Sequence, residues 1–190
     1  MNKDSFISEV FKEDFPFKDS CIDKEFNSCE FINLNFSDFN FSGASFVDCR
    51  FERCSFSNVN FDNCTFNQNF FDHCNFLGII FSKINEFLLQ LSFENSKLEF
   101  CIFENIDMKG SVFTEDRVFN CSFINSNLKD SNFSKSDFNK TNFIKCNLEN
   151  SDFRLAKSFY IDISNCKLKK AKFTQPEVLS LLDSFGIEVE

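Results

Sequence analysis

Ten cysteines are the most reactive residues in this 190-residue chain, and their spacing suggests two kinds of chemistry. Four pairs are separated by twenty residues: Cys29 and Cys49, Cys54 and Cys74, Cys101 and Cys121, and Cys146 and Cys166. Strands stacked with that period would bring each pair within disulfide range. A zinc site is not expected, because no C-x-x-C motif occurs. In a reducing compartment each cysteine would stay a free thiol, a compact hydrophobe packed beside a larger side chain.

Other catalytic groups lack the partners that they would need. His73 is the only histidine, so a Ser or Cys nucleophile would depend on it as general base, yet its predicted position is an outward corner. The four glycines lie far apart, so no phosphate-binding glycine motif exists. The carboxylates fall at outward positions, where no pocket would shift their pKa values. We therefore expect no active site, no cofactor and no metal.

The elements that position these residues are revealed by phenylalanine. The chain has 32 Phe, which cannot be scattered over a surface without causing aggregation. From Phe26 to Phe81 every fifth residue is Phe, and from Phe93 to Phe173 sixteen of the seventeen slots at this spacing are Phe, Leu, Ile, Met or Val, with Ser158 as the exception. A period of five fits neither a helix nor an alternating strand. Each five-residue unit is expected to form one short extended side followed by a corner.

A second inward slot lies two residues before each of these apolar residues. It is usually small or apolar, and nine of the ten cysteines occupy it, Cys21 being the exception. The remaining positions are mostly Asn, Asp, Ser, Glu and Lys, which we expect on the outside. Residues twenty apart, such as Phe26, Phe46 and Phe66, should then lie above one another at the strand spacing of roughly 4.8 Å. Each buried Phe contributes about 2–3 kcal/mol to this stack.

The units CSFSN, CTFNQ, SNFSK, SDFNK and TNFIK resemble the pentapeptide-repeat family, whose pattern is a small residue, Asn or Asp, a central Leu or Phe, and two polar residues. The resemblance covers roughly Phe26 to Phe173. It implies an all-β fold, a right-handed quadrilateral β-helix in which four units, or twenty residues, make one coil.

Breaks in the period divide the chain into segments. We expect an N-terminal capping coil over 1–25, repeat segments over 26–81 and 93–173, a register slip over 82–92, and a C-terminal helix within 174–190. The step from Phe81 to Phe93 is twelve residues rather than ten, and Leu88 already fits the second register, which places the slip within Ser82 to Glu86. The slip is either a kink in the rod or a short projecting loop that touches a partner.

The C-terminal segment is predicted to be an α-helix. Thr174 and Glu177 fit a capping box, Pro176 lies in the first turn and Gly186 follows the last apolar residue. After it, a short strand would alternate apolar and acidic residues. The helix is either a lid over the last coil or a lid whose free face also forms a twofold dimer, and we favour the dimer. The predicted dimerisation residues are Val178, Leu179, Leu181, Leu182, Phe185 and Ile187.

The charge distribution points to a protein partner. The formal net charge of −9 argues against direct binding of nucleic acid, which needs a basic face, but leaves open a basic protein surface. Residues 1–81 hold 13 Asp and Glu against 6 Lys and Arg, whereas residues 82–190 hold 16 against 14. Lys167, Lys169, Lys170 and Lys172 cluster before the helix. The candidate partner-binding acidic surface comprises Glu25, Glu30, Asp38, Asp48, Glu52, Asp62 and Asp72.

Two further stretches, EVFKEDF and AKFTQPEVLSLLDSFGIEV, are similar to the quinolone-resistance (Qnr-like) branch of the family. This resemblance implies a homodimeric acidic rod that mimics DNA, binds a type II topoisomerase (DNA gyrase or topoisomerase IV) and relieves inhibition by quinolones. The alternative is a generic scaffold with an unknown protein partner. No signal peptide or membrane span is evident, so we expect a cytoplasmic protein without a membrane partner.

Overall fold

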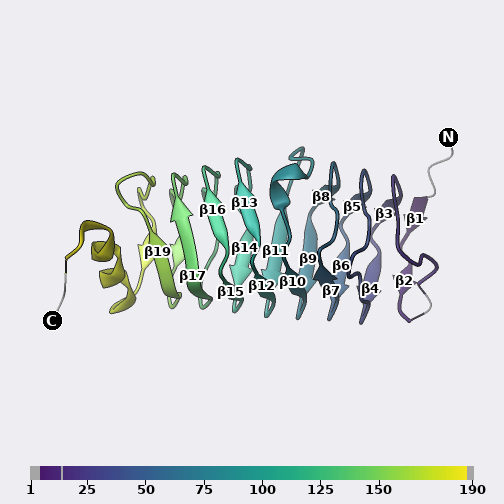
Figure 1. Ribbon diagram of the computed structural model, residues 1–190, viewed down its shortest axis with the longest axis horizontal. Coiled ribbons are helices and arrows are strands. Elements are labelled where there is room, and N and C mark those ends of the chain that lie inside the picture. Colours follow the sequence, from purple (N-terminus) through teal and green to yellow (C-terminus); the bar gives the residue numbers. More distant parts are fainter. Residues whose placement is uncertain (1–4, 14, 188–190) are drawn as a thin grey trace.

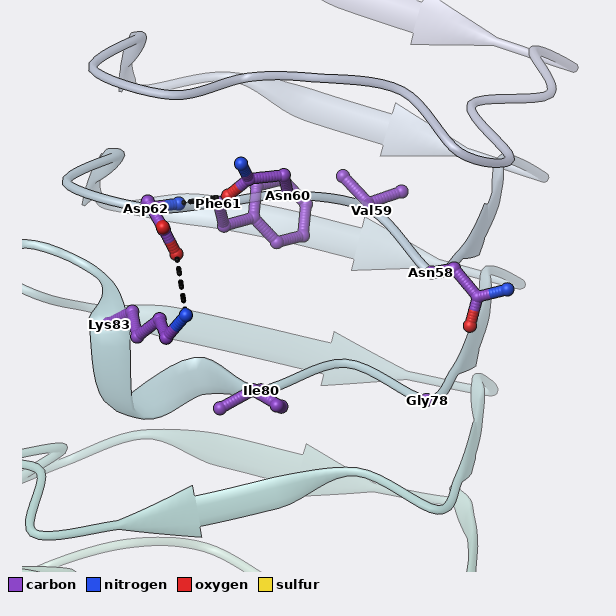
Figure 2. Close-up of a pocket in the computed structure, with 8 residues that line it drawn as sticks. All are labelled: Asn58, Val59, Asn60, Phe61, Asp62, Gly78, Ile80 and Lys83. Carbon is purple, nitrogen blue, oxygen red and sulfur yellow. Dashed lines mark hydrogen bonds and ion pairs between the residues drawn. The ribbon is translucent and has the colours of Figure 1, made fainter.

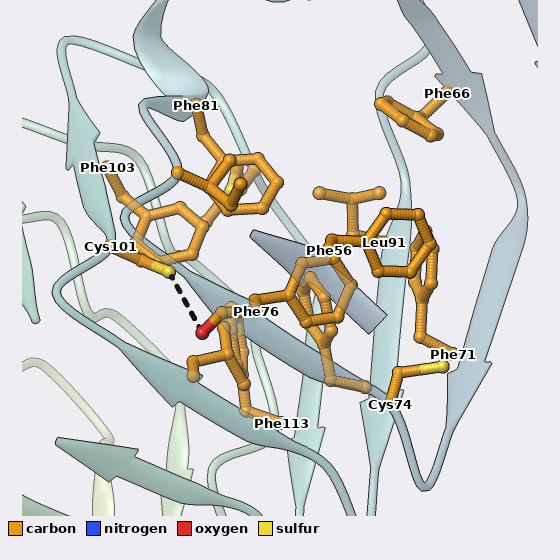
Figure 3. Close-up of a cluster of buried hydrophobic side chains, with 14 of the residues drawn as sticks. Phe56, Phe66, Phe71, Cys74, Phe76, Phe81, Leu91, Cys101, Phe103 and Phe113 are labelled. Atoms are coloured by element: carbon orange, nitrogen blue, oxygen red, sulfur yellow. Dashed lines mark hydrogen bonds between the residues drawn. The ribbon is translucent and has the colours of Figure 1, made fainter. Parts of the chain in front are cut away.

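Phenylalanine rings twenty residues apart stack on one another and form the core of a rod of coils. The computed structural model describes residues 5–13 and 15–187 (Figure 1). The rings of Phe26 and Phe46 are 5.0 Å apart and tilted by 7°, and those of Phe46 and Phe66 are 5.4 Å apart and tilted by 11°. This confirms the predicted column. Rings on adjoining sides of one coil meet edge to face, as in Figure 3.

Each coil has four sides, and we number the four faces of the rod by the Phe columns behind them. Face 1 lies over Phe26 and Phe46, face 2 over Phe31 and Phe51, face 3 over Phe36 and Phe56, and face 4 over Phe41 and Phe61. Neighbouring strands on a face are parallel and in register at twenty residues in the first segment.

The strands are short because a corner follows each side. In chain order they are β1 Ser5–Ile7, β2 Val10–Phe11, β3 Glu25–Asn27, β4 Glu30–Ile32, β5 Ser45–Val47, β6 Arg50–Glu52, β7 Ser55–Ser57, β8 Thr65–Asn67, β9 Asn69–Asp72 and β10 Asn75–Leu77. After the 3₁₀ helix η1 (Phe81–Lys83) come β11 Leu91–Glu94, β12 Lys97–Glu99, β13 Ile102–Glu104, β14 Val112–Thr114, β15 Arg117–Phe119, β16 Ser122–Ile124, β17 Asp137–Ile144, β18 Asp152–Phe153, β19 Lys157–Ile161, β20 Lys172–Phe173 and the 3₁₀ helix η2 (Glu177–Phe185).

The corners explain the polar residues of the repeat. The residue two after the central Phe adopts a left-handed conformation, as Asn33 does with φ 56° and Asn63 with φ 57°. Asn and Asp tolerate this conformation better than most residues. The Asn or Asp before the central residue accepts a hydrogen bond from the N–H two residues on, for example Asn60 Oδ1 from the N–H of Asp62 at 2.8 Å. Such local bonds set the direction of each turn.

The inward small slot is a hydrogen-bonding position as well as a packing position. Thr141 Oγ1 accepts from the N–H of Cys121 at 3.1 Å and donates to the carbonyl of Val118 at 3.0 Å. Cys54 Sγ likewise donates to the carbonyl of Phe31 at 3.3 Å. Cys, Ser and Thr fit this slot because they are small and satisfy buried backbone groups of the coil below.

The register changes where the second repeat segment begins. Thr65 pairs with Asn85, a separation of twenty, whereas Asn69 pairs with Leu91, a separation of twenty-two. The two additional residues therefore lie between Asn85 and Leu91, and Figure 1 shows this part of the chain rising from the rod just after η1. The prediction that Leu88 fits the second register is wrong: Leu88 is exposed with φ 56°, and Leu89 is buried in its place.

A second irregularity explains the exception at Ser158. Asp137 pairs with Lys157 at a separation of twenty, but Thr141 pairs with Phe159 at eighteen. Ser158 adopts a left-handed conformation with φ 56° on the outside, and the ring of Phe159 is buried next to Phe153. The core therefore keeps an aromatic ring at this level although the slot itself holds serine.

Larger side chains cover the N-terminal end of the core. Phe15 contacts the rings of Phe11, Phe36 and Phe39 with centroids 5.4, 5.4 and 6.0 Å away. Phe39 occupies a slot that is usually small, and it is 3% exposed. Its ring also contacts those of Phe36 and Phe41, with centroids 5.5 and 4.6 Å away.

At the other end, the expected α-helix is a 3₁₀ helix, η2, which packs on β19 (Figure 1). Thr174 Oγ1 accepts from the N–H of Leu155 at 2.9 Å, so it ties the segment to the last coils. The hydroxyls of Ser180 and Ser184 donate to carbonyls three residues earlier, at 2.8 and 3.0 Å. Such local bonds compete with α-helical hydrogen bonding, and nine residues are too few to enforce an α-helix. The strand expected after Ile187 lies outside the described residues.

Across the part of the chain that the structure describes, no helix is both long and apolar enough to cross a membrane.

Candidate binding surface

Three carboxylates stand in one column on face 2. Glu52 pairs in register with Asp72, and Asp72 pairs with Glu94. All three follow a buried central Phe in a strand, so their side chains project outward next to a corner. We call Glu52, Asp72 and Glu94 the acidic ladder. Glu94 was not among the predicted acidic residues, but adding the two-residue slip to the twenty-residue period would have found it.

Basic side chains from the same face contact the ladder. Arg50 lies 3.4 Å from Asp72 and stacks over the ring of Phe70 at 4.8 Å. Arg53 pairs with Glu52, and His73 Nδ1 is 2.8 Å from Asp72 Oδ1. Burial disfavours ionisation of Asp72, but hydrogen bonds from Asn95 and His73 and the charge of Arg50 outweigh it and lower its pKa. Asp72 therefore stays charged at neutral pH.

The other predicted acidic residues do not join the ladder. Glu25 is on β3 of face 1 and Glu30 is on β4 of face 2. Asp38 and Asp48 are exposed corner residues with φ 58° and 54°. Asp62 lies on face 4, where Lys83 is 3.7 Å away. The predicted set is thus distributed around the rod, and only Glu52 and Asp72 stand in one column.

The predicted dimerisation residues divide into two rows. In a 3₁₀ helix residues three apart lie above one another. Val178 and Leu181 are half-buried, and Leu181 packs on the core of the last coil. Leu182 is also half-buried, whereas Leu179 and Phe185 are 43% and 57% exposed, and Ile187 after the helix is 49% exposed. One row of η2 packs on the last coil, and the other row presents apolar surface at the C-terminal end of the rod.

The thiols lie in the core. Nine cysteines are buried, Cys166 is half-buried, and all ten are free. Burial raises the pKa of Cys49 and of Cys21 to about 12, and that of Cys64 well above its ordinary value. A buried neutral thiol is a poor nucleophile. Cys21, outside the small slot as predicted, takes a central slot instead and is fully buried.

His73 stands at an exposed corner with φ 53°, and its ring contacts Asp72. Among the residues described, no three His, Cys, Asp or Glu side chains gather closely enough to hold a metal ion.

Depressions on the rod are shallow and lie between neighbouring coils. One of about 280 Å³ is lined by Val59, Asp62, Gly78, Ile80 and Lys83, among others, and opens to solvent on face 4 (Figure 2). The ion pair of Asp62 and Lys83 bridges two coils along one side of it. Such a groove suits contact with another surface better than enclosure of a small molecule.

An exposed apolar patch, which the sequence reasoning missed, lies around the corner between faces 3 and 4. Ile80 and Ile102 are paired in register and are 47% and 37% exposed. Leu77 and Phe100 are also exposed, and Phe100 meets the ring of Phe119 edge to face at 6.2 Å. We call these five residues the corner patch. The sequence signal for the corner patch was the presence of apolar residues at outward positions of neighbouring five-residue units.

Comparisons with known proteins agree with this geometry. The family described as Pentapeptide repeats matches residues 29–68 and 119–156, with eight copies of the repeat. The sequence matches no curated protein. Among solved structures, two trypsin-treated variants of QnrB1, described as a plasmid-mediated fluoroquinolone resistance protein, share the fold. One has a TM-score of 0.60 with 17% identity and the other 0.56 with 20%, and each alignment covers 99% of this chain and 98% of the other.

The matched repeats and the unmatched coils between and beyond them have the same four-sided geometry. A core of stacked Phe rings, a small inward slot and left-handed corners recur on both sides of the register slip. The chain is a β-solenoid with the fold of the QnrB1 structures, and its residues 29–68 and 119–156 match the pentapeptide-repeat family.

Proposed function

We propose that this protein is a non-catalytic binding rod, and that its partner is the DNA-binding surface of a type II topoisomerase such as DNA gyrase. The observation that carries the proposal is the acidic ladder of Glu52, Asp72 and Glu94 on consecutive coils. Stacked Phe rings fill the inside of the rod, so contact with a partner takes place on its outer surface.

The spacing of the ladder suits a basic groove. Adjacent strands place the three carboxylates about 4.8 Å apart along the rod, which is comparable to the spacing of phosphates along one DNA strand, about 3.4 Å per residue. The lowered pKa of Asp72 keeps the middle charge ionised. Electrostatic complementarity of this kind raises the rate and the specificity of association.

The likeness of fold to QnrB1 supports the choice of partner. That protein is described as conferring fluoroquinolone resistance, and its structure aligns with almost the whole of this chain. By analogy, the present rod would relieve inhibition of gyrase by fluoroquinolones. Because fold alone does not determine function, this step needs its own test.

The proposal includes a homodimer formed through the C-terminal end. Leu179, Phe185 and Ile187 offer an apolar surface next to the last coil. An isologous contact would join two rods end to end and double the length of the acidic surface. The exposed residues Lys169, Lys170 and Lys172 lie in the coil that precedes η2, and they would stand at the rim of this contact.

A gyrase supercoiling assay with ciprofloxacin tests the proposal. The protein should restore supercoiling at a drug concentration that stops the enzyme. The variant Glu52→Gln, Asp72→Asn and Glu94→Gln should lose most of this effect. The control variant Glu30→Gln, Asp38→Asn and Asp48→Asn changes the net charge equally at scattered positions and should retain it. Equal loss in both variants would show that net charge, and not the position of the ladder, causes the effect. Absence of protection by the unmodified protein would overturn the proposal.

A second candidate function is that of a scaffold for a different protein partner, favoured by the corner patch. An apolar patch contributes nothing to imitation of DNA, whereas it is typical of protein interfaces. The pair Ile80→Ser and Ile102→Ser separates the two candidates. Protection of gyrase should survive this change, because the ladder makes that contact, whereas capture of a different partner in a pull-down should be lost if the patch binds it.

A further inference from the structure

A carboxyl group is buried in the core of the second repeat segment. Asp116 is 1% exposed and occupies an inward small slot between the central residues Phe113 and Val118. Its column holds Cys74 and Ser96 on preceding coils and Ser136 on the next, linked by hydrogen bonds at 3.0, 2.7 and 2.8 Å. A carboxylate in this slot is unexpected, because a buried charge needs a partner.

The serines of this column each make two kinds of hydrogen bond. Ser136 Oγ accepts from the N–H of Asp116 at 2.8 Å and donates to the carbonyl of Phe113, twenty-three residues earlier, at 3.0 Å. Ser96 Oγ accepts from the N–H of Cys74 at 3.0 Å, and its hydroxyl lies within donating distance of the carbonyls of Glu94 at 3.0 Å and Phe71 at 3.3 Å. A polar side chain in this slot thus meets two requirements: it accepts from one backbone N–H and donates to one backbone carbonyl.

Asp116 meets only the first requirement if it is ionised. Its Oδ1 accepts from the N–H of Ser96 at 2.7 Å. Its Oδ2 is buried and has no hydrogen-bond donor among the residues that the structure describes. An ionised carboxylate can only accept, so it would leave a charged oxygen unpaired in the core.

Asn69 shows how a side chain of the same shape satisfies both requirements. It occupies an equivalent small slot and is 1% exposed. Its Oδ1 accepts from the N–H of Cys49 at 3.1 Å, and its Nδ2 donates to the carbonyl of Phe46, twenty-three residues earlier, at 2.9 Å. A protonated aspartic acid has the same arrangement of one acceptor and one donor.

We propose that Asp116 is held as an un-ionised carboxylic acid whose Oδ2–H donates to the carbonyl of Phe93, so that a single proton links two coils in the middle of the rod. Phe93 lies twenty-three residues before Asp116, which is the separation seen for Ser136 and Asn69. Loss of the proton removes this link and leaves a charge in the core. The folded rod therefore becomes less stable as the pH rises.

The electrostatic surroundings support the neutral form. Burial raises the pKa of Asp116 well above its ordinary value and the charge of Glu94 adds to this, while the N–H of Ser96 opposes it. The adjoining slots hold uncharged Ser96 and Ser136, and the nearby inward titratable groups are the thiols of Cys74 and Cys121. The charged side chains of the flanking strands and corners take outward positions; these are Glu94, Lys97, Glu115, Arg117 and Asp137.

The direction of the pH effect follows from the raised pKa. Between the ordinary Asp value of about 4 and the folded-state pKa, the folded chain holds a proton that the unfolded chain has released. The contribution to stability is complete below this window and is lost as the pH rises through it. Relative to a variant without the group, the unfolding equilibrium constant should increase about tenfold per pH unit.

Two reciprocal variants test the proposal. Asp116→Asn supplies the donor permanently, and Asn69→Asp places a carboxyl in the matched slot. Urea unfolding between pH 5 and pH 9 should show the midpoint of the wild type falling relative to that of Asp116→Asn as the pH rises. Asn69→Asp should fall more steeply still, because it adds a second group of the same kind. Identical pH dependence of the wild type and Asp116→Asn would overturn the proposal.

A spectroscopic measurement reads the proton directly and does not depend on reversible unfolding. In protein labelled with ¹³C at the aspartate carboxyl carbons, one signal should keep the chemical shift of a protonated acid at pH 7. That signal should be missing from the spectrum of Asp116→Asn. If every carboxyl signal of the folded wild type titrates near pH 4, Asp116 is ionised and the proposal is wrong.

Discussion

At the scale of single residues, the small inward slot combines packing with hydrogen bonding. Thr141 is 1% exposed and holds one backbone N–H and one carbonyl of the preceding coil. The slot accepts Cys, Ser, Thr, Asn and Asp for one physical reason: each of them can serve these backbone groups from a small volume. Ala44 and Ala156 fill it by size alone.

Thr141→Val should therefore destabilise the rod although it keeps the shape of the side chain. The change leaves the N–H of Cys121 and the carbonyl of Val118 buried without this partner, which costs about 2 kcal/mol. The free energy of unfolding in urea measures the loss. Thr141→Ser is the matched control, since it keeps the hydroxyl and loses one methyl group, at about 0.8 kcal/mol. If the valine variant proved the more stable of the two, packing alone would define the slot.

Sequence alone predicted which residues point inward, because the five-residue period is nearly unbroken. It could not predict the hydrogen-bond partners in the small slot, since these lie about twenty residues away and depend on the register between coils. Leu88 and Ser158 show where prediction from the five-residue period fails. Counting by fives placed Leu88 inside, but the chain uses Leu89, and it buries Phe159 in place of Ser158. A local bulge costs less than leaving the core unfilled.

At the scale of elements, the register slip is the main departure from a uniform coil. Phe87 and Leu88 are 73% and 61% exposed on the two-residue insertion. The Oε2 of Glu86 accepts from the N–H of Asp107 at 3.0 Å, which ties the insertion to the coil above. The alternatives of a kink in the rod and a contact loop for a partner both remain proposals for this segment.

Deletion of Glu86 and Phe87 should give a folded protein. It restores a twenty-residue spacing across the slip and places Leu88 in the central slot. Surface loops tolerate such changes at little cost, so the thermal midpoint should move by only about 2–4 °C. Deletion of Asn125 and Ser126 from a regular coil is the control. It would move each following central residue into the small slot and each polar corner residue into a central slot, so a cooperative transition should disappear.

The same deletion variant distinguishes the two proposals for the slip. A variant that folds and still protects gyrase identifies the insertion as a structural bulge. A variant that folds and no longer protects identifies it as a contact loop.

The C-terminal element shows why the secondary structure of a short segment is hard to predict. The apolar pattern of Val178, Leu181 and Leu182 correctly indicated a helix that packs on the last coil. It did not reveal the 3₁₀ geometry, which depends on bonds made by Ser180 and Ser184 and on the contact with β19. Tertiary packing decides the conformation of so short a helix.

At the scale of the whole molecule, the dimer proposal depends on the exposed row of η2. The double variant Leu179→Glu and Phe185→Glu should be monomeric in size-exclusion chromatography with light scattering, because it places charges in an apolar contact. The unmodified protein should have twice that mass. Phe87→Glu, on a more exposed apolar residue far from η2, should remain dimeric. A monomeric unmodified protein would remove the end-to-end dimer from the account.

The acidic ladder was only partly predictable at this scale. Composition indicated an acidic N-terminal half, and Glu52 and Asp72 were identified from it. Which carboxylates share a column depends on where the register slips, so Glu94 was missed and dispersed residues such as Asp38 were included. Pairing of Arg50 with Asp72 could not be predicted either, because it links residues on neighbouring coils and depends on the register.

Displacement of DNA from the topoisomerase tests directly whether the rod occupies the DNA-binding surface. A fluorescent duplex is bound to gyrase, and its anisotropy is followed as the rod is added at low and at physiological salt. We expect that the rod releases the duplex, that release weakens as salt screens the charges, and that the neutralised ladder variant releases far less. Simultaneous binding of duplex and rod, with no fall in anisotropy at saturating rod, would contradict binding of the rod at the DNA-binding surface.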